Sequence, residues 1–266
     1  MNSESLARKM RRTVLEMTSS SGASHIGSCL SVLDIVAVLY SDVFGITITN
    51  WKSTDANRVI LSKGHSVASM YAALAERKFL EPREIETFCK DGSRLGGHPN
   101  HLVPGIELST GSLGHGLPFG VGMALGKKTR KSAGKVFVIM SDGELDEGTT
   151  WEAALFAAHN KLDNLTVVID RNRLQSLEST ELTLSLEPLD KKFEAFNWHV
   201  VVIDGHDHIQ IRQSLELVTG SPNLVIAETT KGRGVSFMEN EVKWHYKSPN
   251  LEELQRALTD LESRDL

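Results

Sequence analysis

The chain has 266 residues, 40% of them hydrophobic and 24% charged, which is ordinary for a globular protein and excludes a disordered chain, a collagen and a coiled coil. Its formal net charge of −5 argues against a protein that tracks nucleic-acid phosphates, and no apolar run approaches the ~18 residues that a membrane span requires. Because the first residues lack the apolar block of a signal peptide and two cysteines are too few for a disulfide framework, we expect a cytoplasmic protein with no nucleic-acid or membrane partner.

The first third of the chain is predicted to be helical. Apolar residues recur there at helical spacing, and a short continuous apolar run, typical of a buried strand, precedes the third predicted helix. The predicted helices cover residues 6–17, 31–43 and 67–77, and the predicted strand covers 58–61. Gly22 and Gly27 are interpreted as turn residues.

From residue 111 onward, predicted helices and strands alternate. The strands cover 136–140, 165–170, 200–203 and 224–228, and the helices between them cover 117–129, 151–160 and 209–218. The strands are continuous Val, Ile and Leu runs, which is typical of parallel strands covered by helices on both faces. We therefore expect an α/β fold, a doubly wound and mainly parallel sheet, in one domain over residues 1–266 with a helical N-terminal segment and a C-terminal helix at 251–266. In such folds ligands bind in the loops at the carboxyl ends of the strands.

Polar side chains follow two of these strands. Asp142 and Asn172 lie 30 residues apart, about one strand–helix–strand unit. If the two strands are neighbours, a carboxylate and a carboxamide meet at one sheet edge, and such oxygens bind Mg²⁺ together with phosphate oxygens and water. A turn residue and a loop cap are the ordinary alternatives for each residue taken alone. Their combination favours a metal–diphosphate site.

A glycine-rich segment, 110–117, opens one of the predicted helices. Its glycines permit close backbone approach, and a helix N-terminus favours anions. The segment has neither the Walker nor the Rossmann spacing, so by itself it indicates only an anion-compatible loop.

Several of the ten histidines lie in loop-like contexts, namely His25, His65, His98 and His245. Their spacing matches no zinc motif. Imidazoles that converge on a hydroxylated substrate could serve as acid, base and hydroxyl clamp near neutral pH, with a structural role as the alternative for each of them. Other histidines are interpreted as structural or solvated, namely His159, His199, His206 and His208.

Asp142-Gly143 followed by Asn172 resembles the thiamine diphosphate signature, and further motifs resemble one branch of those enzymes, the transketolases. They recur in the family's order as Ser-His-Ile-Gly at 24–27, Leu-Ser-Lys-Gly-His at 61–65, Gly-His-Pro at 97–99, Gly-Ser-Leu-Gly-His-Gly at 111–116, Asp-Gly-Glu-Leu-Asp-Glu-Gly at 142–148 and Lys-Gly-Arg-Gly-Val-Ser-Phe-Met-Glu at 231–239. The resemblance covers nearly the whole chain, but a full transketolase is more than twice as long. The chain therefore resembles the N-terminal, diphosphate-binding subunit of a split transketolase.

The resemblance implies a role for each matching residue. Mg²⁺, with Ca²⁺ as an alternative, would be held by Asp142, Asn172 and the backbone carbonyl of Leu174. Thiamine diphosphate would be bound by His65, Gly111, Ser112, Leu113, Asp142, Gly143, Asn172 and His245. Sugar hydroxyls and protons would be handled by His25, His98 and His245, while Glu147 would couple the two subunits. The chain departs from the family pattern at Ser141, Ser112 and His115, where the family usually has glycine, proline and glutamine.

The implied reaction transfers a two-carbon ketol unit from a ketose to an aldose. The implied partner is a separate C-terminal transketolase subunit in an α₂β₂ assembly, and the substrates are sugars or sugar phosphates, with sulfonated and branched sugars as alternatives. The α subunit of a 2-oxo acid dehydrogenase shares the metal signature, although an oxo acid lacks the hydroxyls that the histidines would bind. A non-catalytic cofactor-binding partner is the third reading.

Overall fold

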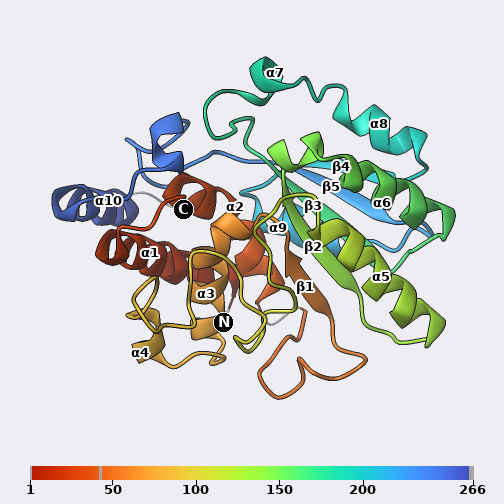
Figure 1. The fold of residues 1–266 in the computed structure, drawn as a ribbon, viewed down its shortest axis with the longest axis horizontal. Helices are drawn as coiled ribbons and strands as arrows, with labels where there is room; N and C mark the ends of the chain where they lie inside the picture. The colour runs from red at the N-terminus through yellow and green to blue at the C-terminus, as the bar shows by residue number, and fades with distance from the viewer. Residues whose placement is uncertain (1, 42–43, 264–266) are drawn as a thin grey trace.

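The computed structural model describes residues 2–41 and 44–263, and within them the chain forms a five-stranded sheet in the order β1-β2-β3-β5-β4 (Figure 1). All strand pairs are parallel. The strands are β1 (Arg58–Leu61), β2 (Val136–Ser141), β3 (Leu165–Arg171), β4 (His199–Asp204) and β5 (Asn223–Glu228). The predicted strands and the α/β class are confirmed, and every strand except β1 is slightly longer than predicted.

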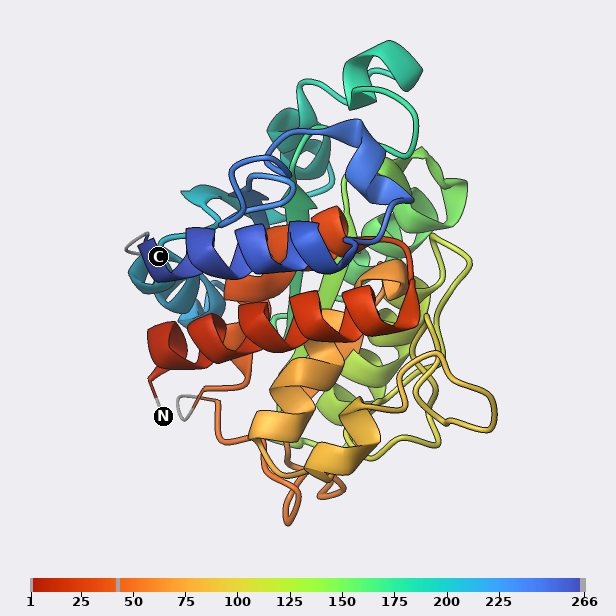
Figure 2. The same cartoon turned by 90° about the vertical axis from the view of Figure 1, so that its left-hand side faces the viewer.

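Helices cover both faces of this sheet, as predicted (Figure 1). One face carries α1 (Ser3–Ser21), α2 (Ile26–Leu39), α3 (Val67–Glu76), α9 (His208–Glu216) and α10 (Leu251–Ser263). The other face carries α5 (Gly116–Thr129), α6 (Gly148–His159) and α8 (Leu189–Ala195). Figure 2 shows α10 lying alongside α1, so that the two ends of the described chain pack together. Short turns of helix complete the fold, namely α4 (Pro82–Ile85), α7 (Thr180–Thr183), η1 (Gly64–Ser66), η2 (Gly143–Asp146) and η3 (Val242–His245).

The continuous apolar runs of the strands are explained by burial on both faces. In β2, Val138 and Met140 pack with the helices α5, α6 and α8, whereas Phe137 and Ile139 pack with α1, α2 and α3. Because successive side chains of a strand point to opposite faces, a strand buried on both sides needs apolar residues at every position.

The start of α2 differs from the prediction. The helix begins at Ile26 rather than at residue 31, and His25 precedes it with a left-handed φ of 78°. Gly27 is therefore a helical residue and not a turn residue, and a Cβ there would lie 3.3 Å from the side chain of Lys231. Gly22 ends α1 with a φ of 68°, as a turn glycine does.

Some predicted helical residues cannot be compared. Residues 42–43 of one predicted helix and residues 264–266 of the last one lie outside the described residues. Among the described helices, none combines the length and the apolar character needed to cross a membrane.

Candidate active site

A cavity of about 260 Å³ lies where the loops after β1, β2, β3 and β5 meet the start of α2 and the turn η3. This is the carboxyl edge of the sheet, where ligands bind in doubly wound folds. Most site residues predicted from the sequence line it, namely His25, His65, His98, Gly111, Leu113, Asp142, Gly143, Asn172, Leu174 and His245.

Asp142 follows β2 and is only 2% exposed. Its carboxylate accepts hydrogen bonds from the backbone N–H groups of Gly143 at 2.8 Å and Arg173 at 2.6 Å. Burial and the nearby Asp170 carboxylate raise the pKa of Asp142, and the Arg171 guanidinium at 3.4 Å opposes this shift. A buried carboxylate in such a setting is stabilised in its charged form by a cation.

Asn172 lies beside Asp142 because β2 and β3 are neighbours, with Ser141 in register with Asp170. The Asn172 side-chain oxygen accepts a hydrogen bond from the Leu174 N–H at 3.2 Å. The Leu174 carbonyl in turn accepts from the ammonium group of Lys231 at 3.1 Å, so this oxygen already faces a positive charge. The prediction that Asp142 and Asn172 lie at the same edge of the sheet is therefore confirmed.

The atoms at this edge that could ligate a metal ion are oxygen atoms of different chemical kinds. Across residues 2–41 and 44–263, no group of three or more His, Cys, Asp or Glu side chains is placed to hold a metal ion. A metal in the cavity would therefore depend on one carboxylate, one amide oxygen and one backbone carbonyl, a set that suits Mg²⁺ or Ca²⁺ and not zinc.

Two buried lysines also line the cavity. Lys63 is fully buried and forms an ion pair with the fully buried Asp170. Burial by itself would raise the pKa of Asp170, but the Lys63 ammonium outweighs it and the pKa is lowered. Lys231 is 1% exposed and donates to the carbonyls of Leu174 and Gln175, and burial together with Lys63 lowers its pKa to about 8. Because Asp170 balances the charge of Lys63, the ammonium group of Lys231 is the one that makes the cavity suitable for an anion.

Histidine side chains from distant segments converge on the same cavity. The His25 ring centroid lies 5.0 Å from that of His245, 5.3 Å from that of His65 and 6.3 Å from that of His98. The backbone N–H of His25 donates to the His245 carbonyl at 2.8 Å, which joins the start of α2 to η3. The positive φ of His25 is thus held by a contact between two predicted site residues.

Three of these imidazoles are neutral at neutral pH. Burial is the main cause, and the neighbouring lysines and histidines add to it. The pKa falls to about 4 for His25 and to about 3 for His245, and the pKa of His65 falls well below 6.5. The His25 and His65 rings therefore each have one N–H donor and one nitrogen acceptor. In His245, Nδ1 already accepts from the Lys231 ammonium at 3.1 Å, which leaves its Nε2–H as a donor to a ligand.

We expect the chain to lose stability as the pH falls from about 6.5 toward about 4. In the unfolded chain His25 and His245 bind protons near pH 6.5, whereas in the folded chain they stay neutral to about 4 and about 3. The unfolded state binds more protons in this window, so each histidine lowers the free energy of unfolding by up to about 1.4 kcal/mol per pH unit. Urea denaturation at pH 7 and pH 5 measures the loss. A His25→Asn/His245→Asn variant should lose less than the wild type, and equal losses would contradict the prediction.

Two predicted site residues lie beside the cavity rather than in its lining. Ser112 is exposed between Gly111 and Leu113, which both line it. Glu147 is exposed at the N-cap of α6, where a Cβ added to Gly114 would lie 2.6 Å from the Glu147 Cβ. The roles assigned to Ser112 and Glu147 stay predictions.

Sequence reasoning missed the two lysines. Lys63 and Lys231 lie inside the motifs at 61–65 and 231–239, but a lysine in a loop is ordinarily exposed, so the sequence predicts no role for either. Only their burial distinguishes these two lysines from ordinary surface lysines, and burial depends on the surrounding fold. The position of Lys231 three residues after a strand end was the one signal available.

Comparison with known proteins identifies the family. The family model of the transketolase thiamine diphosphate binding domain matches residues 2–261. One relative, named as a subunit of the apulose-4-phosphate transketolase of Phocaeicola vulgatus, is 40% identical over 261 residues, which cover 97% of this chain and 93% of that protein. Another, a 6-deoxy-6-sulfo-D-fructose transketolase subunit of a Clostridium species, is 35% identical over 260 residues, covering 96% of this chain and 94% of that protein.

The fold leads to the same family. The crystal structure of the Campylobacter jejuni transketolase matches with a TM-score of 0.93 and 28% identity, over 98% of this chain and 43% of that chain. The chain thus spans less than half of that transketolase and nearly all of the two relatives that are named as subunits. These matches favour a transketolase over the 2-oxo acid dehydrogenase alternative. The chain belongs to the transketolase family and corresponds to its thiamine diphosphate-binding domain.

Proposed function

We propose that the chain is the N-terminal subunit of a thiamine diphosphate-dependent transketolase, which transfers a two-carbon ketol unit from a ketose to an aldose and acts with a separate C-terminal subunit. The main support for this proposal is the cavity. Its lining contains oxygen atoms that could ligate a metal ion, two buried lysines and neutral histidines. Two relatives that span the same length are named as transketolase subunits. Residues 1–266 would form one diphosphate-binding domain.

Mg²⁺, or Ca²⁺ in its place, would be held by Asp142, Asn172 and the carbonyl of Leu174. The residues fit such an ion because Asp142 is 2% exposed with a raised pKa, and a divalent cation would stabilise the buried carboxylate in its charged form. All three donors are hard oxygen atoms, which both ions prefer. Diphosphate oxygens and water would complete the coordination.

The diphosphate would be attracted by Lys231, which lines the cavity together with Lys63, whose charge Asp170 balances. Gly143 would let the backbone approach the diphosphate, and a Cβ there would lie 3.1 Å from the side chain of Gln175. The rest of the cofactor would contact the residues assigned by the resemblance, namely His65, Gly111, Ser112, Leu113 and His245. When bound, thiamine diphosphate supplies the stabilisation of the negative charge that forms on the donor carbon as the C–C bond breaks.

The proposed tasks of His25, His98 and His245 are to bind sugar hydroxyls and to move protons. Neutral rings can accept a proton from a hydroxyl at one nitrogen while donating a hydrogen bond from the other. His25 fits this task because burial lowers its pKa to about 4. His245 would bind a hydroxyl as a donor from Nε2, because its Nδ1 accepts from the Lys231 ammonium at 3.1 Å. His98 is exposed at the mouth of the cavity, where a substrate would enter.

We expect His98→Ala to lower turnover by about 10²- to 10⁴-fold while leaving cofactor affinity nearly unchanged, since the ring meets substrate and not the diphosphate. Steady-state kinetics at saturating cofactor and calorimetric titration with thiamine diphosphate separate the two effects. His101→Ala is the matched control, because His101 is exposed in the same loop, bonds Ser109 at 2.8 Å and does not line the cavity. Lost cofactor affinity with normal turnover at saturation would show that the assigned role is wrong.

The proposed partner is a C-terminal transketolase subunit in an α₂β₂ assembly. Large apolar side chains are exposed on the neighbouring helices α5 and α6, namely Phe119, Leu155 and Phe156. Exposed apolar surface of this kind suits a subunit contact. Glu147 at the start of α6 would face the same subunit.

The proposed substrates are ketoses with an anionic group, since the two relatives are named for a sugar phosphate and a sulfonated sugar. The proposed compartment is the cytoplasm. Its reducing conditions suit a chain in which Cys29 and Cys89 are both free.

The test is an assay of the chain co-expressed with a second transketolase subunit, supplied with thiamine diphosphate and Mg²⁺. Ketose phosphates and sulfonated ketoses are offered as donors with an aldose acceptor, and release of the shortened aldose is followed. A parallel assay offers 2-oxo acids and follows release of CO₂. Ketol transfer supports the proposal, whereas CO₂ release without ketol transfer would restore the oxo acid alternative.

A further inference from the structure

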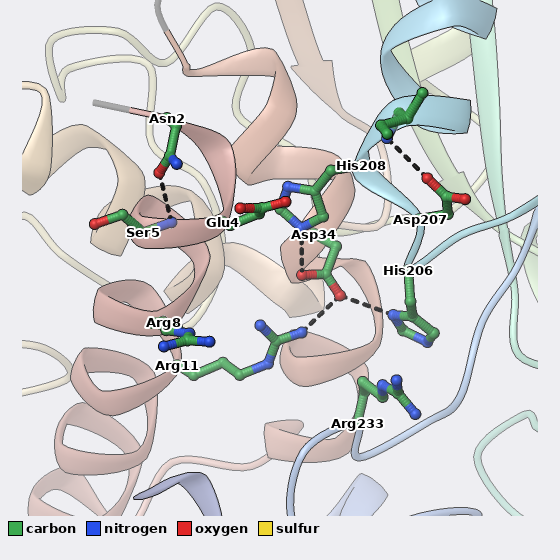
Figure 3. Close-up of a pocket in the computed structure, with 11 residues that line it drawn as sticks. Asn2, Glu4, Ser5, Arg8, Arg11, Asp34, His206, Asp207, His208 and Arg233 are labelled. Atoms are coloured by element: carbon green, nitrogen blue, oxygen red, sulfur yellow. Dashed lines mark hydrogen bonds and ion pairs between the residues drawn. The ribbon is translucent and has the colours of Figure 1, made fainter. Parts of the chain in front are cut away.

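A second cavity, of about 630 Å³, lies between the N-terminal half of α1 and the loop that joins β4 to α9 (Figure 3). It shares no lining residue with the cofactor cavity. Its lining includes Arg11 from α1, Asp34 from α2, and His206 and His208, two histidines that the sequence analysis interpreted as structural or solvated. Figure 3 shows the two histidine rings and the Arg11 guanidinium pointing toward the Asp34 carboxylate.

Asp34 is the centre of this cluster and is 2% exposed. Its carboxylate accepts from Arg11 at 2.6 Å, from His206 Nδ1 at 2.8 Å and from His208 Nε2 at 3.1 Å. Burial alone would raise the pKa of Asp34, but these donors outweigh burial and hold the pKa far below its usual range. Asp34 is therefore a fixed carboxylate that can hold both rings in place.

His206 differs from His208 in what its second nitrogen does. His206 Nε2 receives the backbone N–H of Thr230 at 2.8 Å, and an N–H group can only donate. The ring must therefore carry its hydrogen on Nδ1, which is the nitrogen that Asp34 binds. His208 instead pairs its second nitrogen with the hydroxyl of Ser3 at 2.8 Å, at the start of α1.

Thr230 directly precedes Lys231, whose ammonium lies in the cofactor cavity. The flanking residues are held as well, since the Thr229 N–H donates to the Arg171 carbonyl at 3.1 Å and the Gly232 N–H to the Gly27 carbonyl at 2.9 Å. Because Lys231 is 1% exposed and fits against Gly27, its ammonium position follows from the position of this backbone.

We infer that His206 is a positioning residue for the cofactor site. Asp34 fixes its Nδ1–H form, and its Nε2 holds the Thr230 backbone so that the Lys231 ammonium stays where the diphosphate binds. This inference rests on the proposed function, because it assigns the cofactor cavity to a diphosphate. The contacts form an unbroken series from the second cavity to the first. Outer partners that orient binding groups typically change affinity by about 10- to 100-fold when they are lost.

The test compares His206→Ala with His208→Ala in the full chain, together with its second subunit, by calorimetric titration with Mg²⁺ and thiamine diphosphate. Both variants remove one donor from Asp34, but only His206→Ala removes the acceptor of the Thr230 N–H. We expect His206→Ala to raise the Kd for thiamine diphosphate by about 10-fold or more. We expect His208→Ala to leave the Kd within about 2-fold, although both lower the thermal midpoint.

Conservative variants keep the test decisive if His206→Ala does not fold. Glutamine can place its amide oxygen near the position of Nε2, whereas asparagine is too short and reaches only the position of Nδ1. His206→Gln should therefore bind the cofactor more tightly than His206→Asn. In a double-mutant cycle, His206→Ala should cost no further affinity when Lys231 is already changed to Met.

Equal Kd values for the His206 and His208 variants, or full additivity with Lys231→Met, would overturn the inference and leave the proposed function intact. Failure of the wild-type complex to bind thiamine diphosphate at all would reject the proposed function and the inference with it.

Discussion

We expect Asp142→Ala to lower the affinity for thiamine diphosphate by more than about 100-fold, beyond the usual cost of losing an outer partner of a metal site. The diphosphate carries several negative charges, and the loop at 142–147 is itself acidic. Without a divalent ion, this loop would repel the cofactor. Calorimetry of the two-subunit complex with thiamine diphosphate measures the effect, and ketol transfer should be lost in parallel.

Two variants and a chelator make this result specific. Asp142→Asn keeps the size of the side chain and an oxygen for one of the two N–H groups, those of Gly143 and Arg173, which bind different carboxylate oxygens. It removes the charge, so it should lose affinity as well. Asp163→Ala removes an exposed ion pair with Lys128 at 2.7 Å and should change nothing. EDTA should abolish binding to the wild type, and added Ca²⁺ should restore it. Unchanged affinity in Asp142→Ala or in EDTA would contradict the metal assignment.

We expect the 266-residue chain by itself to show no multiple-turnover ketol transfer. It spans 43% of the Campylobacter jejuni transketolase, and two relatives of its own length are named as subunits. The rest of the active site would come from the second subunit. The apolar side chains exposed on α5 and α6 would then be uncovered, so we also expect the isolated chain to self-associate or to be poorly soluble.

The measurement is aldose release by the purified chain with thiamine diphosphate, Mg²⁺ and a range of ketose donors. The same assay is repeated with a co-expressed C-terminal subunit of about 300 residues, a size taken from the family resemblance, and light scattering reports the assembly. Activity should appear only in the second case. Appreciable turnover by the chain alone would refute the split-enzyme proposal.

The strands and the layered arrangement were predictable, because a run of apolar residues buried on two faces leaves a local pattern. Helix starts were less predictable. α5 begins at Gly116, where the apolar pattern begins at Leu117, and α6 begins at Gly148, where the predicted helix begins at Trp151. Glycine is a weak helix former, so tertiary contacts decide such positions. The Gly116 N–H, for example, donates to the Ser62 hydroxyl at 3.1 Å.

The site was predictable where residue type and position after a strand coincide. Asp142 and Asn172 follow strands one strand–helix–strand unit apart, and the pairing of β2 with β3 brings them to one edge. Gln175 carried no such signal, although its carbonyl accepts from Lys231 and its side chain lies next to Gly143. Its place in the cavity depends on how the loop after β3 folds back.

The sequence by itself determined the α/β class, the parallel strands and the residues at the strand ends, because periodicity and residue type are properties of neighbouring positions. Only the tertiary structure decided which charged groups are buried together. Lys63 and Asp170 are 107 residues apart and form a buried ion pair, and His206 meets Asp34 across 172 residues. Burial removes water from a charge, so the pairing of these groups depends on all the elements that surround them, and no local pattern carries that information.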